Sequence, residues 1–457
     1  MRKSTRDKSC VRPLRYAVSE KHKGKDFQMA AQSKMANQSK LATQMDSQTT
    51  CINPLAPHMT QSLSAAEVEL VEQYQHYKRF NPYRCNDDAV IRRENTPQDA
   101  ATPLRGAFVR DVEKIMHTQA YNRLAGKTQV FSFRPQDDFC RRGLHVQLVA
   151  RIARDMGRAL GLNTDLIEAI ALGHDIGHTP FGHAGEYFLN KVYHERTGRW
   201  FFHNVMSARV LDVLYRRNIS LQMLDGALCH NGEFEQQVFK TSNLHSFEEF
   251  DHIVEACWAT GNDTILHLRP MTLEGCIVRI SDILAYVGKD RQDAVRAGIV
   301  NEKTFDDGLG SRYNTWALSA FSNDIVRHSL GSTQISMSDE AFAELARAKR
   351  ENYEKIYLTH EVSGDLSNRV DELFEMLYEQ CLTWMQQGDE ENPLFVHHIK
   401  PLERSLAYYG QRYAWQDDHD LTAVDYIASM TDDYFVALCQ HLDPSYAERF
   451  PHYSYFA

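Results

Sequence analysis

Apolar residues recur at intervals of three and four along most of the chain, which predicts a mainly helical protein. The clearest run predicts a helix that ends at Gly161, and its apolar positions are Leu144, Leu148, Val149, Ile152, Met156 and Leu160. A second helix should start at Asn163 or Thr164, either of which suits an N-cap, and lead into His174–Asp175. His145 falls on the apolar stripe of the first helix. Since the two helices form an antiparallel pair, we expect His145 to face the end of the second.

The same spacing predicts helices elsewhere in the chain. Ser64 and Glu67 form a capping box that opens a helix to about Tyr77. Other helical stretches are expected at residues 106–131, 191–231, 272–290 and 338–457. Residues 232–270 show no pattern that decides between helix and strand. The expected fold class is all-α, with an ordered core at 64–300 and a C-terminal helical region at 301–457 packed on it.

Composition narrows the class of protein. No apolar run approaches the roughly 20 residues that a membrane-spanning helix needs, so we expect no membrane partner. The nine cysteines are odd in number and include no C-x-x-C pair. This favours reduced thiols, buried as small apolar side chains, in a cytoplasmic protein over a disulfide framework.

Charge is unevenly spread along the chain. Residues 1–50 hold eleven Lys and Arg against four Asp and Glu, whereas the whole chain has a net charge of -10. Residues 1–63 lack apolar periodicity, so we expect a disordered basic tail. A transit peptide and a nucleic-acid-binding arm are the alternatives to a solvated tail. The remainder is acidic, and binding an anion there requires locally concentrated positive charge.

The stretch AIALGHDIGHTPFGHAGE at residues 169–186 is the richest in chemistry. An apolar run ends at His174–Asp175, a Gly/Pro turn follows, and a second helix begins with His183 and Glu186 one turn apart. Imidazole and carboxylate suit a divalent cation, but two adjacent ligands cannot complete its shell. Further ligands must come from elsewhere. Taken singly, each histidine is more simply a packed or solvated residue.

His145, His174–Asp175 and Asp282 follow in chain order, each on a separate expected helix. This order resembles the H…HD…D metal ligands of the HD phosphohydrolase superfamily. The resemblance implies an HD-domain helical core in which these four residues hold one divalent metal ion per site. The ligand types do not distinguish Mn, Mg and Fe.

The flanking sequence resembles the bacterial dGTPase family of deoxynucleoside triphosphate (dNTP) triphosphohydrolases from about Arg105 to Asp432. The segments that carry this resemblance are 123–131, 142–145, 174–186, 202–209, 282–290 and 425–432. Val146 and Gln147 follow His145 where the family usually has a serine, and Ser429 replaces a usual glycine. The first departure adjoins a ligand and could tune the site.

The resemblance implies hydrolysis of a dNTP, most simply dGTP, to a deoxynucleoside and inorganic triphosphate. Water would attack the α-phosphorus. His183 would protonate the leaving 5'-oxygen, and Glu186 would orient His183 and hold it charged. His203 matches a histidine expected on phosphate oxygens. The plain alternative for His183 and Glu186 is a salt-bridged helix start.

The same resemblance assigns substrate binding to Gln129, Arg142, Tyr286 and Asp290. Arg142 matches a phosphate-binding arginine, whose planar fork suits that task, and Gln129 matches a residue that contacts the sugar. Tyr286 would stack on the deoxyribose where a 2'-hydroxyl would clash, and Asp290 would accept a hydrogen bond from the 3'-hydroxyl. An ordinary half-buried helix face is the alternative for this pair.

Two histidines and two other functions stay open. We interpret His178 as a turn cap or a support for a ligand, and His230 has no assigned role. The alternative functions are another HD phosphohydrolase, such as a nucleotide monophosphatase or phosphodiesterase, and a non-catalytic nucleotide- or nucleic-acid-binding regulator. The resemblance also implies a homo-oligomer. It leaves open a nucleotide effector or single-stranded nucleic acid as a further partner.

Overall fold

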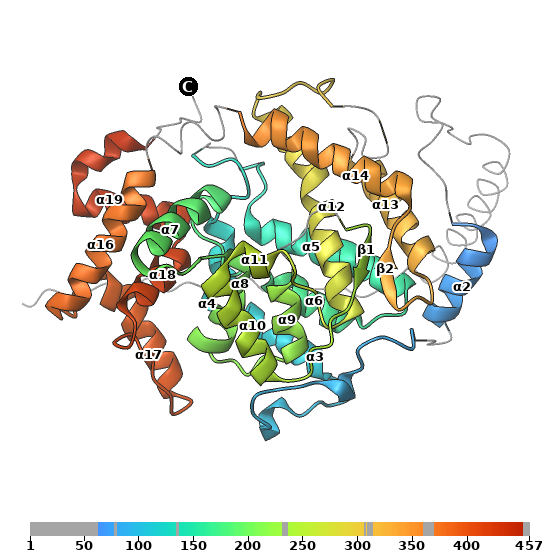
Figure 1. Ribbon diagram of the computed structural model, residues 1–457, viewed down its shortest axis with the longest axis horizontal. Coiled ribbons are helices and arrows are strands. Elements are labelled where there is room, and N and C mark those ends of the chain that lie inside the picture. The colour runs from blue at the N-terminus through green and yellow to red at the C-terminus, as the bar shows by residue number, and fades with distance from the viewer. Residues whose placement is uncertain are drawn as a thin grey trace, which may run out of the picture. The chain divides into compact units, whose positions relative to one another are not determined.

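Three helices pack against one another in the computed structural model and carry the HD residues: α5 (Arg142–Ala159), α6 (Thr164–Gly173) and α12 (Leu273–Arg296). The structure describes residues 63–76, 80–133, 137–230, 236–305, 308, 314–359 and 370–450. Helices α3 (Ala107–Met116) and α9 (Leu221–Leu228) pack on α6, and α13 (Asn314–Ser329) and α14 (Asp339–Asn352) pack on α12. Figure 1 shows this arrangement, with α12 in yellow beside α5 and α6.

The remaining described α-helices are α2 (Ala65–His76), α4 (Gln119–Arg123), α7 (Gly182–Thr197), α8 (His203–Arg209), α10 (Phe247–Thr260), α11 (Asn262–Ile265), α16 (Asp371–Gln387), α17 (Lys400–Ala407), α18 (His419–Ser429) and α19 (Asp432–Leu442). Short 3-10 turns lie at Asp87–Ala89, Pro97–Asp99, Leu124–Gly126 and Pro444–Arg449, and π turns at Val210–Leu214, Tyr353–Tyr357 and Phe395–Ile399. Residues 232–270, for which the sequence did not distinguish helix from strand, contain the short strand β1 (Val238–Lys240). It pairs antiparallel with β2 (Gln334–Ser336). The all-α class is confirmed.

Side-chain caps set the start of three helices where the sequence predicts them. The Asn163 side chain accepts from the backbone N–H groups of residues 165 and 166 and opens α6. Thr272 opens α12 in the same way. At α2 the Ser64 N–H donates to Glu67 Oε2 at 2.6 Å, and Ser64 Oγ accepts from the Glu67 N–H. Each cap satisfies backbone donors that have no partner within the helix.

The expected helical stretch at residues 106–131 is broken, which corrects the prediction. Helix α3 ends at Met116 because the Thr118 hydroxyl donates to Ile115 O and also accepts from the Tyr121 N–H, which starts α4. Beyond Gly126 the chain leaves the helix, and Thr128 instead forms a bridge with Arg141. This bridge places residues 127–129 beside the start of α5.

Helix α5 has the predicted length, but its buried face is turned from the predicted stripe. Leu144 is 50% exposed, whereas His145 is buried at 3%. The buried face also includes Arg142, Val146 and Val149. The stripe turns because α12 and α6 both contact α5 on the side that carries His145, and this leaves Leu144 facing outward.

The C-terminal helices pack beside the segment that follows the HD pair. Helix α7 contacts α16 and α18, and Figure 1 shows α16 to α19 in orange and red gathered around it. Residues 58–457 form one unit, and the boundary proposed between 300 and 301 stays a prediction. The expected tail at 1–63 lies outside the described residues except for Leu63.

Two composition-based expectations bear on the described residues. None of the helices in that part of the chain is long and apolar enough to cross a membrane. Seven of the nine cysteines are described, and all seven are free thiols. Six are buried as expected, whereas Cys85 is half-buried.

Candidate metal centre and active site

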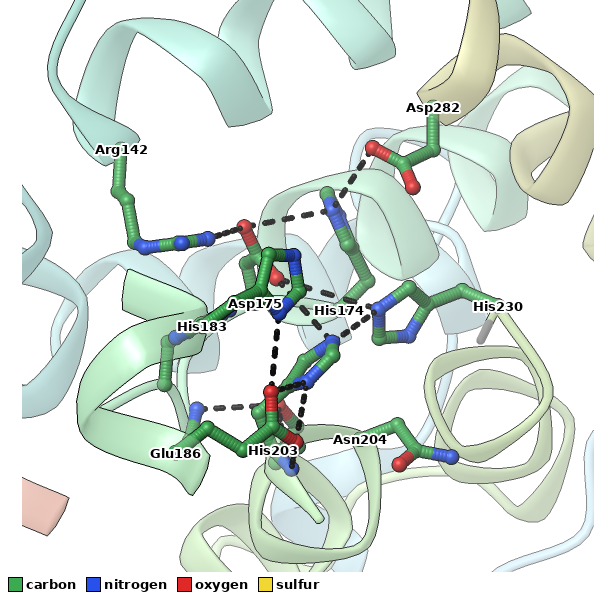
Figure 2. Close-up of polar contacts among 12 residues, drawn as sticks. Arg142, His174, Asp175, His183, Glu186, His203, Asn204, His230 and Asp282 are labelled. Atoms are coloured by element: carbon green, nitrogen blue, oxygen red, sulfur yellow. Dashed lines mark hydrogen bonds and ion pairs between the residues drawn. The ribbon is translucent and has the colours of Figure 1, made fainter. Parts of the chain in front are cut away.

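Four side chains from α5, α12 and the turn that directly follows α6 lie close together. Their closest donor atoms are separated by 2.8 Å (His145 Nε2 to Asp282 Oδ1), 3.7 Å (His174 Nε2 to Asp282 Oδ1), 3.8 Å (His174 Nε2 to Asp175 Oδ2) and 3.9 Å (His145 Nε2 to Asp175 Oδ2). Figure 2 shows Asp175 and Asp282 on either side of the histidine nitrogens. We call these four residues the HD cluster.

The tautomer of His174 suits a metal ligand. Its Nδ1 lies 2.8 Å from Ala171 O, and because a carbonyl can only accept, Nδ1 carries the proton. The Nε2 lone pair therefore points into the cluster, where it is buried without a hydrogen-bond partner. Metal bonds of about 2.0–2.2 Å put neighbouring ligand atoms roughly 3–4 Å apart, which matches the spacing in the HD cluster.

Both carboxylates of the HD cluster are held in the charged form that a cation needs. Burial alone would raise the pKa of Asp175, but Arg142 and the neighbouring histidines hold that pKa well below its usual range. The Arg142 Nη1 donates to Asp175 Oδ2 at 2.6 Å. Burial likewise opposes ionisation of Asp282, and the hydrogen bond with His145 outweighs it, so the pKa of Asp282 is lowered.

A second cluster, the Glu186 cluster of His183, Glu186 and His203, lies beside the first. Glu186 Oε2 is 3.0 Å from His183 Nδ1, and Oε1 is 2.9 Å from His203 Nδ1. Oε1 also accepts from the His203 backbone N–H at 2.8 Å, so Glu186 caps α8. Burial alone would raise the pKa of Glu186, but the two histidines lower it far below its usual range.

His203 carries a proton on each ring nitrogen. Its Nε2 lies 3.1 Å from His230 Nε2, and His230 Nδ1 lies 2.6 Å from Ala227 O. The carbonyl requires a proton on His230 Nδ1, so His230 Nε2 accepts and His203 Nε2 donates. Burial would lower the pKa of His203, but the charge and hydrogen bonds of Glu186 raise it. His203 is therefore an imidazolium. Figure 2 shows its ring between Glu186 and His230.

Sequence reasoning missed His230, which lies in the site. It is 6% exposed, its ring is 4.6 Å from that of His174, and its Nε2 is 3.9 Å from Asp175 Oδ1. Burial lowers the pKa of His230 to about 3, so its ring stays neutral. The only sequence signal was the turn-like His230-Asn231-Gly232, which carries no chemistry of its own.

The structure also places His178, which lies within the site and is fully buried. Its ring stacks on His203 with centroids 4.3 Å apart, and neither of its nitrogens has a hydrogen-bond partner. The predicted turn cap by its side chain is therefore wrong. Its backbone carbonyl instead accepts from Lys127 Nζ, which also donates to Ala428 O at 2.7 Å.

The turn between the two clusters is held by residues far away in the chain. Asp432 accepts from the backbone N–H groups of Phe181 and Thr128, each at 3.0 Å. Phe181 and Gly182 both have φ of 60°, a left-handed conformation that glycine adopts without strain. At Gly177 a Cβ would lie 2.2 Å from Ser207 N, so only glycine fits against α8.

The residues predicted to bind substrate lie around these clusters. Arg142 is buried, and its Nε and Nη2 have no hydrogen-bond partner. A Cβ on Gly182 would lie 3.2 Å from both Arg142 Nη2 and Gln129 O, so both residues lie beside the start of α7. On α12, Tyr286 is half-buried and Asp290 is buried. Their roles toward a sugar stay predictions.

The fold and the HD cluster define the class of protein. The HD domain family matches residues 142–287, which include the whole HD cluster. A curated protein of Caldanaerobacter subterraneus subsp. tengcongensis named "Deoxyguanosinetriphosphate triphosphohydrolase-like protein" is 32% identical over 378 residues, covering 80% of this chain and 92% of its own. A protein of the same name from Desulfatibacillum aliphaticivorans is 30% identical over 379 residues, covering 79% and 94%.

A third protein of that name, from Caulobacter sp., is 38% identical over 225 residues, covering 48% of this chain and 54% of its own. The similarity to the first two relatives extends well beyond the HD domain. The chain belongs to the deoxyguanosinetriphosphate triphosphohydrolase-like family of HD-domain proteins.

Proposed function

We propose that the protein hydrolyses deoxynucleoside triphosphates, dGTP foremost, to a deoxynucleoside and inorganic triphosphate. The observation that carries this proposal is the juxtaposition of the HD cluster, with donor atoms spaced for a cation, and the Glu186 cluster, with two histidines on one carboxylate. The names of the relatives supply the substrate class.

His145, His174, Asp175 and Asp282 would hold a divalent ion, with Mn, Mg and Fe all suited to these ligands. Such an ion supplies positive charge to phosphate oxygens and lowers the pKa of bound water. Arg142 contributes a fixed positive charge next to the HD cluster. Because its Nε and Nη2 have no partner, they can donate to phosphate oxygens while Nη1 stays on Asp175.

His183 is the group placed to deliver a proton to the leaving 5'-oxygen. Its side chain is 76% exposed, yet Nδ1 is fixed on Glu186, so Nε2 is available to an incoming substrate. Glu186 fixes the orientation of the His183 ring through this hydrogen bond. His203 lies fixed behind Glu186 and adds a buried positive charge on the side where phosphate oxygens would develop negative charge.

Tyr286 and Asp290 would select the deoxy sugar. Asp290 Oδ2 accepts from the Tyr357 hydroxyl at 2.6 Å, which orients the carboxyl group. Burial raises the pKa of Asp290 to about 7, so near neutral pH this group both donates and accepts hydrogen bonds. The Tyr286→Ala change should therefore reduce the preference for dGTP over GTP, since the ring that a 2'-hydroxyl would strike is gone.

Product analysis tests the proposal. Metal-stripped protein is incubated with each dNTP and with GTP, Mn or Mg is added back, and the products are separated by chromatography. We expect deoxynucleoside and intact triphosphate, with dNTPs preferred over GTP. Orthophosphate or pyrophosphate as the product would contradict the proposal and favour another HD phosphohydrolase. Turnover of no dNTP, with or without a second nucleotide as effector, would favour a binding protein.

A further inference from the structure

A cavity of about 80 Å³ lies against Ile176 and Gly177, in the turn that follows His174 and Asp175 and that we call the HD turn. Its walls come from α4, from Ile176 and Gly177 in the turn, from α8, from the start of α17 and from the end of α18. Figure 1 shows the elements that meet here, with α4 and α8 between the core and the C-terminal helices. Gln119 is exposed at its edge.

The described residues that line the cavity are mostly apolar, but they include four basic residues, Arg123, Lys127, His397 and His398, and no carboxylate. His397 is engaged, since its Nδ1 lies 2.6 Å from the Tyr434 hydroxyl. Arg123 donates a long hydrogen bond of 3.4 Å from Nη1 to Ser429 O. Lys127 is buried and donates to two carbonyl oxygens. His398 is 4% exposed, and its Nε2 has no hydrogen-bond partner. Three basic side chains thus share a small space without an acid to balance them.

The nearby carboxylates are paired with other groups and do not neutralise the basic side chains of the cavity. Asp425 is engaged by Arg209 through two hydrogen bonds of 2.7 and 2.8 Å and by the Tyr413 hydroxyl at 2.8 Å. Asp432 is engaged by two backbone N–H groups. Burial lowers the pKa of Lys127 to about 7 and that of His398 to about 3. For Lys127, burial outweighs the opposing effect of Asp432 and Asp175.

From this cavity we infer a binding site for a small inorganic oxyanion of the size of orthophosphate, held by Arg123, Lys127 and His398. A volume of about 80 Å³ exceeds the room that one water needs. It is far below the roughly 300–1,000 Å³ of pockets that take nucleotide-sized ligands. A bound anion would also brace the HD turn, because Lys127 holds the His178 carbonyl and Gly177 forms part of the wall.

Thermal unfolding of the metal-loaded protein in phosphate tests the site. We expect the melting temperature to rise by about 1–3 °C for each tenfold increase of phosphate above its Kd. Sodium chloride at equal ionic strength should not reproduce this shift. The Arg123→Gln variant should lose the phosphate shift. The Arg404→Gln variant, which alters an exposed arginine of α17 outside the cavity, should keep it.

Two more variants separate this cavity from phosphate binding near the HD cluster and from a failure to fold. Arg142→Gln should keep the shift, because Arg142 does not line the cavity. Gln119→Glu places a carboxylate four residues before Arg123 on α4. In the absence of phosphate, this variant should melt at a higher temperature than the unmodified protein, because the carboxylate replaces the anion. Phosphate should then cause no further rise. A shift lost in Arg142→Gln but kept in Gln119→Glu, no shift in the unmodified protein, or an equal shift in chloride would each overturn the inference.

Discussion

The HD cluster and the Glu186 cluster lie side by side but differ in how their donor atoms are paired. In the HD cluster His174 Nε2 is buried without a partner between Asp282 Oδ1 at 3.7 Å and Asp175 Oδ2 at 3.8 Å, whereas each carboxylate has one hydrogen bond, from His145 or Arg142. In the Glu186 cluster, both carboxylate oxygens and both nitrogens of His203 are used within the protein. Unpaired lone pairs suit a metal ion, whereas a paired chain of charges suits holding and moving a proton.

This difference shows that residue type alone does not define the chemistry of a site. Both clusters contain two imidazoles and at least one carboxylate, and both are buried in large part. The hydrogen bond made by Nδ1 of each histidine decides whether its Nε2 can bind a metal or donates a proton. Ala171 O accepts a hydrogen bond from His174 Nδ1–H and so leaves Nε2 without a proton. Glu186 accepts from His203 Nδ1–H, and His203 Nε2 donates to His230.

The largest expected effect comes from removing a ligand of the HD cluster. His174→Ala should lower kcat/KM for dGTP by about 10³-fold or more, because several kcal/mol of charge stabilisation on phosphate would be lost. Steady-state kinetics with saturating Mn checks this. His441→Ala, at an exposed histidine of α19, is the matched control and should stay within twofold of the unmodified protein. Comparable rates for the two variants would remove the HD cluster from the mechanism.

A smaller loss should follow from neutralising the Glu186 cluster. Glu186→Gln keeps the shape but removes the negative charge that favours protonated His203 and changes the hydrogen bond that orients His183, so kcat should fall about 10²-fold. Metal content should stay unchanged, since no HD-cluster ligand contacts Glu186. A parallel loss of metal and activity would show that the two clusters act as one unit.

His230 lies between the two clusters, with its Nε2 close to both His203 and Asp175. Replacing it tests the hydrogen bond with His203. His230→Phe leaves the His203 Nε2–H without an acceptor in a buried place, which costs about 1–3 kcal/mol. We expect the free energy of unfolding to fall by that amount and kcat to fall roughly tenfold. His230→Gln offers an amide oxygen at a similar position and should recover most of both losses. Equal behaviour of the two variants would argue against the hydrogen bond.

The smallest expected effect is on the pH dependence of stability and comes from Glu274. This residue is buried like Glu186 but has no basic hydrogen-bond partner. Its Oε1 accepts from two backbone N–H groups, and Oε2 has no partner. Burial raises the pKa of Glu274 to about 7, the opposite direction from Glu186. Because the folded state keeps a proton that the unfolded state releases near pH 4.5, stability falls as pH rises from about 4.5 through 7.

The glutamine in the Glu274→Gln variant cannot ionise, so the variant should not lose stability in this way as pH rises. Its advantage in free energy of unfolding over the unmodified protein should grow by roughly 1–3 kcal/mol between pH 5 and pH 8. Denaturant titrations at the two pH values measure it. Asp443→Asn, at an exposed end of α19, is the control and should show no such growth. An advantage that stays constant with pH would contradict the shifted pKa.

Local sequence patterns predicted the parts of the site that lie on helices. The cap at Asn163, the helix from residue 272, and the order of His145, His174–Asp175 and Asp282 come from spacing within single elements and from family motifs. The rotation of α5, which exposes Leu144, depends on which neighbours cover it. The apolar stripe in the sequence does not specify how the helix is rotated about its own axis to within one residue.

Contacts between distant segments could not be predicted. Lys127 meets Ala428 across 301 residues, and Thr128 meets Asp432 across 304. No periodicity within one element encodes such a pairing, although both segments belonged to the family motifs. His230 was missed for the same reason, because its role depends on the position of His203 across two helices and not on its own neighbours in sequence.

The number of metal ions bound by matched variants tests the central claim most directly. Equilibrium dialysis against Mn measures ions per chain for the unmodified protein, His174→Ala and His203→Ala. The account predicts one ion per chain in the unmodified protein and in His203→Ala, and none in His174→Ala. Retention of the ion in His174→Ala together with its loss in His203→Ala would place the metal in the Glu186 cluster and contradict the account.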